Sequence, residues 1–448
     1  MKTAIIPPAP LSGFPELLPE IRIVENRLLD TIRKNYELAG FASIETSAVE
    51  RLEILTSKGA DDREIFTVGR LSQDTDEQDA KLGLRFDLTV PMARYVVQNY
   101  DRLTFPFRRY QIQKSYRGER AQAGRYREFY QADIDIIGDG KLPLSADTEI
   151  LTTIDNVLSD LNIGPYVIRI NNKKILTGFV DSLPGATPEN RAAIIRTIDK
   201  APKVSKEELV DMLAEYLEES AIRQVIEFVN ISKMGNDAVL EYLRTLENSL
   251  VQEGLGELQT VYEQSILLGI DSDRIALDPG IARGLGYYTG TIYETFLVGN
   301  ESLGSICSGG RYENLASYFT DRKLPGVGVS IGVSRLLSRL LTIQNMDTRS
   351  QTPSRVLVTK MDESNSATYL KILRDLRKSG IPSELYLGDG VSIGKQLSYA
   401  DRKGIPYAVI VGEDEMARGE AQIKSLFTGE KEQIPLESLV DRILELLK

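Results

Sequence analysis

The chain has 448 residues, of which 42% are hydrophobic and 27% charged, and its formal net charge is -11. It contains one cysteine, Cys307, and no histidine, which excludes an intrachain disulfide, a thiolate zinc cluster and acid–base chemistry on imidazole. The length favours two or three domains, and any catalysis would use arginine, lysine, carboxylates, tyrosine and the backbone.

No apolar run is long enough to span a bilayer, and Pro7, Pro8 and Pro10 interrupt the short apolar start of the sequence. We therefore expect a cytoplasmic protein without a signal peptide or membrane anchor. The acidic balance argues against nucleic-acid binding over the whole surface, but it allows a local basic tract that contacts phosphates. Mg²⁺ can still be bound, because carboxylates and substrate phosphates are ligands for it.

The first quarter of the chain predicts two helices and two strand regions. Apolar residues at spacings of three and four predict an amphipathic helix over residues 21–36, and residues 41–50 are strand-like. A short strand and then a helix that begins near Pro91 follow. Asp87 and Thr89 would therefore lie at a strand end, where ligand-binding groups are common.

Residues 108–138 predict a long antiparallel hairpin with a basic loop around residues 118–124. Six arginines and Lys114 stand against one acid, Glu119, between residues 108 and 127. A solvated, salt-bridged face explains any one of these arginines more often than function does. Alternation, however, places six residues on one face of the second strand: Arg125, Arg127, Phe129, Gln131, Asp133 and Asp135. Such a row of mostly polar side chains is poorly suited to a hydrophobic core, so it predicts the polar floor of a pocket.

The remaining chain changes character several times. A stretch rich in Glu, Lys, Leu and Ala predicts a helical insertion, strand patterns and glycines then return, and a polar aperiodic stretch predicts a linker. Strands that alternate with helices at the end predict a small, mostly parallel α/β domain. The resulting division is 1–183 and 259–343 for one sheet-based domain, 184–258 for the insertion, 344–353 for the linker and 354–448 for the last domain.

Two further glycine-rich segments carry arginines. Residues 277–296 place Arg283 between glycines and ahead of Tyr288, although turns explain such a segment nearly as well. A later strand runs into a helix with Arg335 near its first turn, where a basic residue opposes the helix dipole and needs an anion nearby.

Separated arginine sites without an evident Ser or Cys nucleophile indicate chemistry on phosphate, in which the substrate supplies the nucleophile. The sequence contains no GxxxxGK[ST] loop and no GxGxxG after a strand, so neither a P-loop nor a Rossmann nucleotide site is supported.

Three segments together resemble the class II histidyl-tRNA synthetases. RGERAQAGRYREFYQ (117–131), ARGLGYYTGTIYE (282–294) and SGGRYENL (308–315) occur in that family's order, and the alternating end resembles its anticodon-binding domain. The resemblance implies an α+β catalytic domain with a six-stranded antiparallel sheet, a helical insertion and a C-terminal α/β anticodon-binding domain. It also implies a homodimer that binds histidine, ATP and histidine tRNA. Ser47 and Gly286 depart from the family, which usually has a proline and commonly has an acid at these places.

The resemblance implies a role for individual residues at the ATP. Arg117 would bind the α-phosphate, Phe129 would stack on the adenine, and Arg335 would cover the other face of the adenine and reach the terminal phosphates. Glu119 would lie near the adenine and the metal, so that Mg²⁺ would be held through ATP and Glu119. The family's catalytic arginine corresponds to Arg283.

The histidine and tRNA contacts that the resemblance implies involve other residues. Asp87, Thr89 and Gln131 would bind the α-amino group of histidine. Asp135 and Tyr288 would read the imidazole, and Arg125 would hold the phosphate and carboxylate region. The candidates for contact with tRNA are Arg120, Gln122, Lys395, Arg402 and Lys403.

Two other functions stay open at this point. The main alternative is the non-catalytic regulatory subunit of ATP phosphoribosyltransferase, which lacks the catalytic arginine and the anticodon domain; Arg283 and residues 354–448 disfavour it. The other is a module that senses uncharged tRNA, which is normally fused to further domains. The lack of histidine fits either adaptation to scarce histidine or drift, which we favour, and histidine usage across the organism's proteins would separate them.

Overall fold

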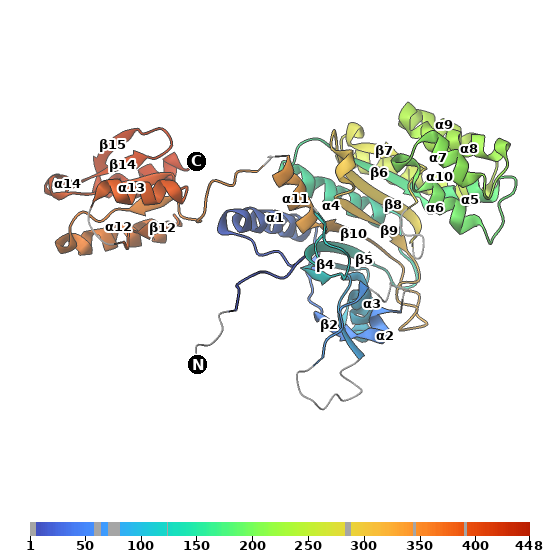
Figure 1. The fold of residues 1–448 in the computed structure, drawn as a ribbon, viewed down its shortest axis with the longest axis horizontal. Coiled ribbons are helices and arrows are strands. Elements are labelled where there is room, and N and C mark those ends of the chain that lie inside the picture. Colours follow the sequence, from blue (N-terminus) through green and yellow to red (C-terminus); the bar gives the residue numbers. More distant parts are fainter. Residues whose placement is uncertain are drawn as a thin grey trace. The chain divides into compact units, whose positions relative to one another are not determined.

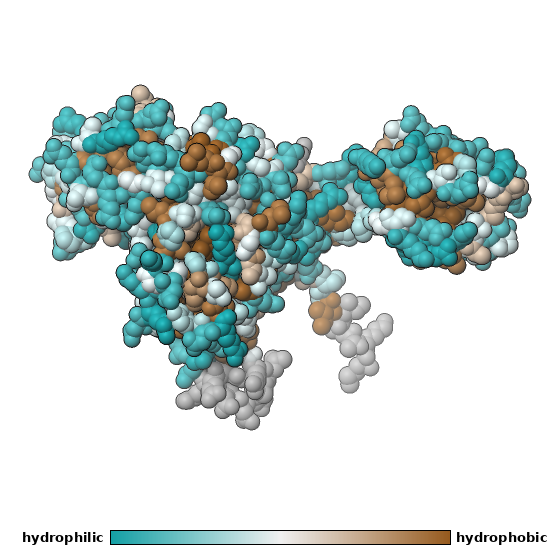
Figure 2. Space-filling view, turned by 180° about the vertical axis from the view of Figure 1, so that it is seen from behind, coloured by the Kyte–Doolittle hydropathy of each residue, from teal (hydrophilic) through white to brown (hydrophobic). Residues whose placement is uncertain are grey.

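The computed structural model describes residues 6–57, 64–69, 81–122, 124–282, 288–343, 346–388 and 392–448. They form two compact units, Met1–Pro15 with Leu28–Asn345 and Glu16–Arg27 with Met346–Lys448 (Figure 1). Hydrophilic residues cover much of the visible surface of both units. Hydrophobic residues form smaller patches on each surface (Figure 2). Among the described helices, none combines the length and the apolar composition that a bilayer crossing requires.

A large sheet organises the first unit. Its strands follow the order β1-β4-β5-β10-β9-β8-β6-β7, and β2 and β3 form a separate pair. The strands are β1 (Ala42–Ser43), β2 (Val49–Arg51), β3 (Leu82–Leu84), β4 (Phe107–Tyr116), β5 (Glu128–Ile137), β6 (Tyr166–Asn172), β7 (Ile275–Leu277), β8 (Tyr288–Leu297), β9 (Cys307–Tyr312) and β10 (Gly326–Gly332). Neighbouring strands pair antiparallel through β4, β5, β10, β9, β8 and β6. At the two edges, β1 pairs parallel with β4 and β7 pairs parallel with β6. The predicted six-stranded antiparallel sheet is confirmed.

The first unit also contains the following helices, of which α1 belongs to this unit with residues 28–38 only. They are α1 (Pro19–Leu38), α2 (Leu52–Leu55), α3 (Thr89–Gln98), α4 (Ser145–Leu161), α5 (Lys173–Asp181), α6 (Arg191–Ile198), α7 (Lys206–Leu213), α8 (Glu219–Asn230), α9 (Asn236–Thr245), α10 (Ser249–Leu267) and α11 (Val333–Thr342). The predicted helical insertion is confirmed as a fold element, and its last helix continues to Leu267. Figure 1 shows α5 to α10 gathered at the β6–β8 end of the sheet.

Strand β5 separates an apolar layer from a polar one. Ala132, Ile134 and Ile136 are buried on one face, where the Tyr36 hydroxyl of α1 donates a hydrogen bond to the Ala132 carbonyl at 3.1 Å. Helix α4 also packs against β5 and β10. Because side chains alternate along a strand, Phe129, Gln131, Asp133 and Asp135 share the opposite face. The sheet therefore turns a row of polar groups away from its helical layer.

One local prediction was wrong in detail. Residues 41–50 form two short strands, β1 and β2, because the chain between them turns toward the buried guanidinium of Arg85, which donates to the Thr46 carbonyl at 2.8 Å. Helix α3 begins at Thr89, which agrees with the predicted start near Pro91. The proline is tolerated there because the first amides of a helix have no intrahelical partner.

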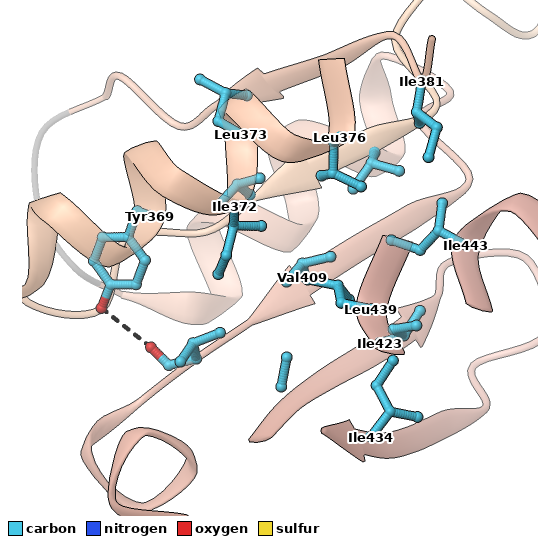
Figure 3. Close-up of a cluster of buried hydrophobic side chains, with 14 residues drawn as sticks. Tyr369, Ile372, Leu373, Leu376, Ile381, Val409, Ile423, Ile434, Leu439 and Ile443 are labelled. Atoms are coloured by element: carbon cyan, nitrogen blue, oxygen red, sulfur yellow. Dashed lines mark hydrogen bonds between the residues drawn. The ribbon is translucent and has the colours of Figure 1, made fainter. Parts of the chain in front are cut away.

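The second unit carries its own sheet, in the order β12-β11-β13-β14-β15. Its elements are β11 (Val356–Val358), α12 (Ser366–Lys378), β12 (Ser383–Leu385), α13 (Ile393–Arg402), β13 (Tyr407–Ile410), α14 (Glu413–Arg418), β14 (Glu420–Ser425), β15 (Lys431–Pro435) and α15 (Leu439–Leu446). Apolar residues of α12, α15 and the sheet form its core, and the Tyr369 hydroxyl donates to the Val411 carbonyl at 3.1 Å (Figure 3).

The α/β fold of this unit is confirmed, but its sheet is mixed and not mostly parallel. Strands β12, β11 and β13 are parallel, whereas β14 and β15 pair antiparallel. The cause is the short connection from Ile410 to Glu420 through α14. A parallel crossover needs about a dozen residues or more, so β14 returns antiparallel beside β13.

Candidate active site

A cavity of about 350 Å³ lies on the polar face of β5. It brings together residues from β5, β8, β9 and β10, from the segment before α3, from the loop after β4 and from α11. The residues that the sequence analysis assigned to ATP or histidine and that line this cavity are Asp87, Thr89, Arg117, Glu119, Arg125, Phe129, Gln131, Asp135, Tyr288 and Arg335. Arg283, the predicted catalytic arginine, and Gly286 lie outside the described residues.

The loop between β4 and β5 is closed by its own backbone. The Arg117 amide donates to the Arg127 carbonyl at 2.8 Å, and Gln122 and Arg125 exchange backbone hydrogen bonds at 2.9 and 3.0 Å. Gly124 has φ +73°, and a Cβ there would meet Arg339 of α11 at 3.3 Å. Glycine therefore lets the loop turn close to α11, which leaves Arg120 and Gln122 exposed outside the cavity lining.

Two arginines and one carboxylate form the basic end of the cavity. The Arg117 guanidinium carbon lies 4.3 Å from the Phe86 ring centroid and 5.1 Å from that of Phe129. Its Nε donates to the Phe86 carbonyl at 3.3 Å. Glu119 lies between the two arginines, 3.3 Å from Arg125 and 4.0 Å from Arg117. The aromatic rings and the carboxylate hold the cations in place before any ligand arrives.

Arg127 does not lie on this face, which corrects the prediction that it continues the row of Arg125 and Phe129. Strand β5 begins only at Glu128, and the Arg127 amide donates to the carbonyl of Gly13 at 2.7 Å. Its side chain lies against Gly13, where a Cβ would approach it to 2.8 Å, and its Nε donates to the Glu119 carbonyl at 3.1 Å. Contact with the N-terminal segment thus turns this arginine away from the cavity.

Amide and carboxylate groups line the middle of the cavity. One oxygen of Asp87 accepts a hydrogen bond from the Val90 amide at 3.0 Å, which fixes this carboxylate at the start of α3. The Gln131 side chain donates to the Ser330 hydroxyl at 3.1 Å. Its Oε1 is buried without a hydrogen-bond partner among the described residues. These groups are suited to bind an amine, because each presents an oxygen that can accept from N–H.

The acidic end of the cavity is built around Asp135. This carboxylate forms an ion pair with the fully buried Arg109 of β4 and accepts a hydrogen bond from the Tyr312 hydroxyl at 2.8 Å. Gly328 faces it across the β5–β10 pairing, and a Cβ there would lie 2.0 Å from the Asp135 carboxylate. Glycine on β10 is therefore what leaves room for this side chain.

Several lining groups were not assigned a role from the sequence. Asp133, Ser330, Tyr312 and Arg109 lie in or beside the acidic end of the cavity. Burial raises the pKa of Asp133 to about 7, which the charges of Asp135 and Asp87 reinforce, whereas Arg109 and a hydrogen bond from Ser330 act against it. The alternation that indicated Asp135 also contained Asp133, but the partners of both depend on pairings with other strands.

The tRNA candidates of the second unit lie on α13. Lys395 and Arg402 are exposed. The Lys403 ammonium, by contrast, donates to both oxygens of Glu384 at 2.7 and 2.9 Å, and the Tyr399 hydroxyl donates to the same carboxylate at 2.9 Å. Lys395 and Arg402 are therefore open to an external phosphate, whereas Lys403 is held by an internal partner.

The arginines lie at one end of the cavity, with Glu119 between two of them, and Asp133 and Asp135 lie at the other end. This polarity suits a ligand whose anionic groups meet Arg117, Arg125 and Arg335 and whose amines meet the acidic end. Among the described residues, no group of three or more His, Cys, Asp or Glu is arranged to hold a metal ion. A single carboxylate, Glu119, lies at the basic end of the cavity, next to Arg117 and Arg125.

Comparisons with known proteins agree with this geometry. Residues 13–336 match the histidyl-tRNA synthetase family and residues 354–446 the anticodon-binding domain family. A histidine–tRNA ligase from Clostridium tetani is 43% identical, with 98% of this chain and 99% of the relative covered. One from Stenotrophomonas maltophilia is 41% identical, with 98% of each covered.

Solved structures give the same result. A histidyl-tRNA synthetase from a Nostoc species superposes with a TM-score of 0.91 at 39% identity and covers 98% of this chain and 100% of its own. A Bacillus halodurans protein described as an ATP phosphoribosyltransferase regulatory subunit/histidyl-tRNA synthetase shares the fold, with a TM-score of 0.72 at 21% identity, 88% of this chain and 97% of its own being covered. On the extent of these matches, the chain belongs to the histidyl-tRNA synthetase family.

Proposed function

We propose that the chain is a histidine–tRNA ligase, a class II aminoacyl-tRNA synthetase that forms histidyl-adenylate from histidine and ATP. The observation that carries the proposal is the cavity with arginines at one end and aspartates at the other, in a chain with full-length similarity to such ligases. The regulatory alternative is not favoured, because the chain retains Arg283 and the C-terminal unit.

The reaction needs no protein nucleophile. The histidine carboxylate attacks the α-phosphorus of ATP, a new P–O bond forms, and the bond to the departing pyrophosphate breaks. The 3′-terminal ribose hydroxyl of the tRNA then takes the acyl group and AMP leaves. Negative charge develops on the phosphoryl oxygens, so preorganised arginines stabilise the transition state more than the ground state.

The residues of the cavity and Arg283 divide these tasks. Arg117 binds the α-phosphate, Arg125 holds the phosphate and carboxylate region, and Arg283 is the catalytic arginine. Phe129 stacks on the adenine, with Arg335 over its other face. The histidine is held by Asp87, Thr89 and Gln131 at the α-amino group and by Asp135 and Tyr288 at the ring.

Magnesium is the metal that this donor set fits. Glu119 and the substrate phosphates would hold it, and the ion would neutralise phosphate charge as pyrophosphate leaves. Glu119 also keeps Arg117 and Arg125 oriented through its contacts at 4.0 and 3.3 Å.

Pyrophosphate exchange tests the assignment. Purified protein is expected to incorporate labelled pyrophosphate into ATP only when histidine is added, and no other amino acid should replace it, because only histidine satisfies both ends of the cavity. Absence of exchange from a folded protein would contradict the proposal. The matched control is the same assay with each of the other amino acids at equal concentration.

The tRNA is assigned to two surfaces. Residues 1–183 and 259–343 are the catalytic domain, interrupted by the insertion 184–258; 344–353 is the linker and 354–448 the anticodon-binding domain. Arg120 and Gln122, exposed on the loop that carries Arg117 and Arg125, would meet the acceptor end. Lys395 and Arg402 would contact phosphates near the anticodon. Lys403 would help to position α13, which carries both residues, through its ion pair with Glu384.

Removing the two exposed cations of α13 tests this assignment. The double variant Lys395→Ala, Arg402→Ala is expected to raise the KM for tRNA several-fold and to reduce the salt slope of tRNA binding by about 2, because each lost phosphate contact removes about one unit. Histidine-dependent exchange should stay unchanged. Lys371→Ala, an exposed lysine on α12, is the matched control; an equal effect of that change would show that only net charge matters.

A cytoplasmic homodimer completes the proposal. Exposed apolar residues near the N-terminus, including Ile6, Leu11 and Leu18, support an additional partner surface in that region. The absence of any described helix suited to crossing a membrane is compatible with this location.

A further inference from the structure

A second buried carboxylate, Asp133, lies in the cavity beside Asp135. It is 3% exposed, lines the cavity and faces Ser330 across the β5–β10 pairing. Its Oδ1 has no hydrogen-bond partner among the described residues. Burying such an oxygen without a donor costs free energy, which a ligand can recover by supplying an N–H group. We therefore expect the bound substrate to donate a hydrogen bond to Asp133.

The position of Asp133 along β5 limits which donor this is. Gln131, Asp133 and Asp135 are successive residues on one face of the strand and lie about 7 Å apart from one to the next. In the function proposed above, Gln131 contacts the α-amino group and Asp135 the imidazole. An amino acid that spans these two groups passes over Asp133, so a ring N–H lies within its reach.

Charge balance indicates the protonation state of the ring. Asp87, Asp133 and Asp135 line this part of the cavity, and the buried Arg109 pairs with Asp135. The α-ammonium group of the substrate would balance one of the two remaining carboxylates. A buried charge without a partner is strongly unfavourable, so Asp133, whose pKa burial raises to about 7, either takes up a proton or pairs with a second cation. A protonated imidazole ring supplies it.

Arg109 and Arg85 both act on Asp133 electrostatically, but among the described residues neither forms an ion pair with it: Arg109 pairs with Asp135, and Arg85 donates to the Lys114 and Thr46 carbonyls and to Gln113. Ser330 and, on β4, Gln111 face it across the sheet and are neutral. Burial above all, and then neighbouring charges that include Asp133, raise the pKa values of Tyr36 on α1 and Cys307 on β9, so both stay neutral near pH 7. Burial above all raises the pKa of Asp133 itself to about 7, so a cationic group at this carboxylate favours its charged form.

We propose that Asp133 determines specificity for the charged ring: its carboxylate accepts a ring N–H and, with Asp135, binds the substrate side chain as imidazolium. The inference rests on the proposed histidine activation, which it deepens by naming the ring form that the enzyme selects. The enzyme should then bind an amino acid with an isosteric ring that does not take up a proton less well than histidine, and Asp133 should be the cause of this difference.

The test compares histidine with triazolylalanine, whose ring has the same shape and far lower basicity. The wild-type protein is expected to prefer histidine in kcat/KM of pyrophosphate exchange, and Asp133→Asn to reduce this preference by about tenfold or more, since a hydrogen bond to a charged group contributes a factor of about 10 to 100. The KM for ATP should stay within about twofold in the variant. Asp139→Asn, an exposed carboxylate just past β5, is the control and should leave the preference unchanged.

Proton uptake by the wild-type protein gives a second measurement that does not depend on the variant folding. Calorimetry at about pH 8.5 in buffers of different ionisation enthalpy is expected to show about one proton more taken up with histidine than with triazolylalanine, because free imidazole is neutral there. Equal uptake, or an Asp133→Asn change that lowers exchange equally for both amino acids, would overturn the inference while the ligase assignment stood. A wild-type protein without histidine-dependent exchange would instead remove the ligase assignment.

Discussion

Replacing Arg117 with alanine is expected to lower kcat/KM for histidine-dependent pyrophosphate exchange by about 10²–10³, the cost typical of losing one preorganised donor to a developing oxyanion. Its guanidinium is held by the rings of Phe86 and Phe129 and by the Phe86 carbonyl, so it needs little reorganisation when ATP binds. Most of the loss should therefore appear in kcat.

A lysine at the same position separates charge from geometry. Arg117→Lys keeps a cation but loses the planar fork and its stacking, so activity should stay well below wild type. Arg108→Ala is the matched control, because Arg108 lies on the same hairpin, contacts Ala39 and Glu149, and does not line the cavity. Exchange by Arg117→Ala at the level of Arg108→Ala would show that the α-phosphate is bound elsewhere.

Replacing Asp147 with asparagine is expected to lower the free energy of unfolding of the first unit by about 3–5 kcal/mol, the usual cost of removing one member of a buried ion pair. Asp147 of α4 is fully buried and accepts from the Arg311 Nε of β9 at 3.0 and 3.2 Å. Arg311 also donates to the carbonyls of Leu142 and Pro143. The change would leave its charge buried beside a neutral amide.

Urea denaturation followed by circular dichroism measures this loss. Asp30→Asn is the matched control, since Asp30 and its partner Arg33 are exposed on α1 and such pairs contribute about 1 kcal/mol or less. Similar losses for the two variants would mean that Arg311 finds another partner when Asp147 is neutral, and that α4 and β9 are joined mainly by apolar packing.

Local patterns in the sequence predicted much of the site. The alternation of Phe129, Gln131 and Asp135 identified the cavity face of β5, because period-two alternation follows directly from strand geometry. Asp87 and Thr89 were found from the junction of a strand and a helix. Arg117 and Glu119 followed from a motif in the loop that joins β4 to β5.

Groups whose position depends on distant pairing could not be found this way. Ser330 and Tyr312 reach the acidic end of the cavity through β10 and β9, and nothing close to them in sequence indicates that β5 lies beside β10. The prediction for Arg127 was wrong for the same reason. Its amide is hydrogen-bonded to Gly13 and its side chain packs against this residue, which lies far away along the chain. The face on which a side chain lies can be predicted from its own strand, whereas the choice of neighbouring strand depends on the whole fold.

The pairing of β5 with β10 has a consequence for synthesis of the chain. Gln131 and Ser330 are hydrogen-bonded although they are 199 residues apart, with the helical segment between them. While the ribosome is still translating that segment, the β4–β5 hairpin has an open edge on β5, which is a template for association with other chains. Polar side chains on β5 disfavour such contacts on one face, but Ala132, Ile134 and Ile136 expose the other until the helical layer packs. The cavity is complete only after residue 335 has left the exit tunnel, because Arg335 is part of its lining.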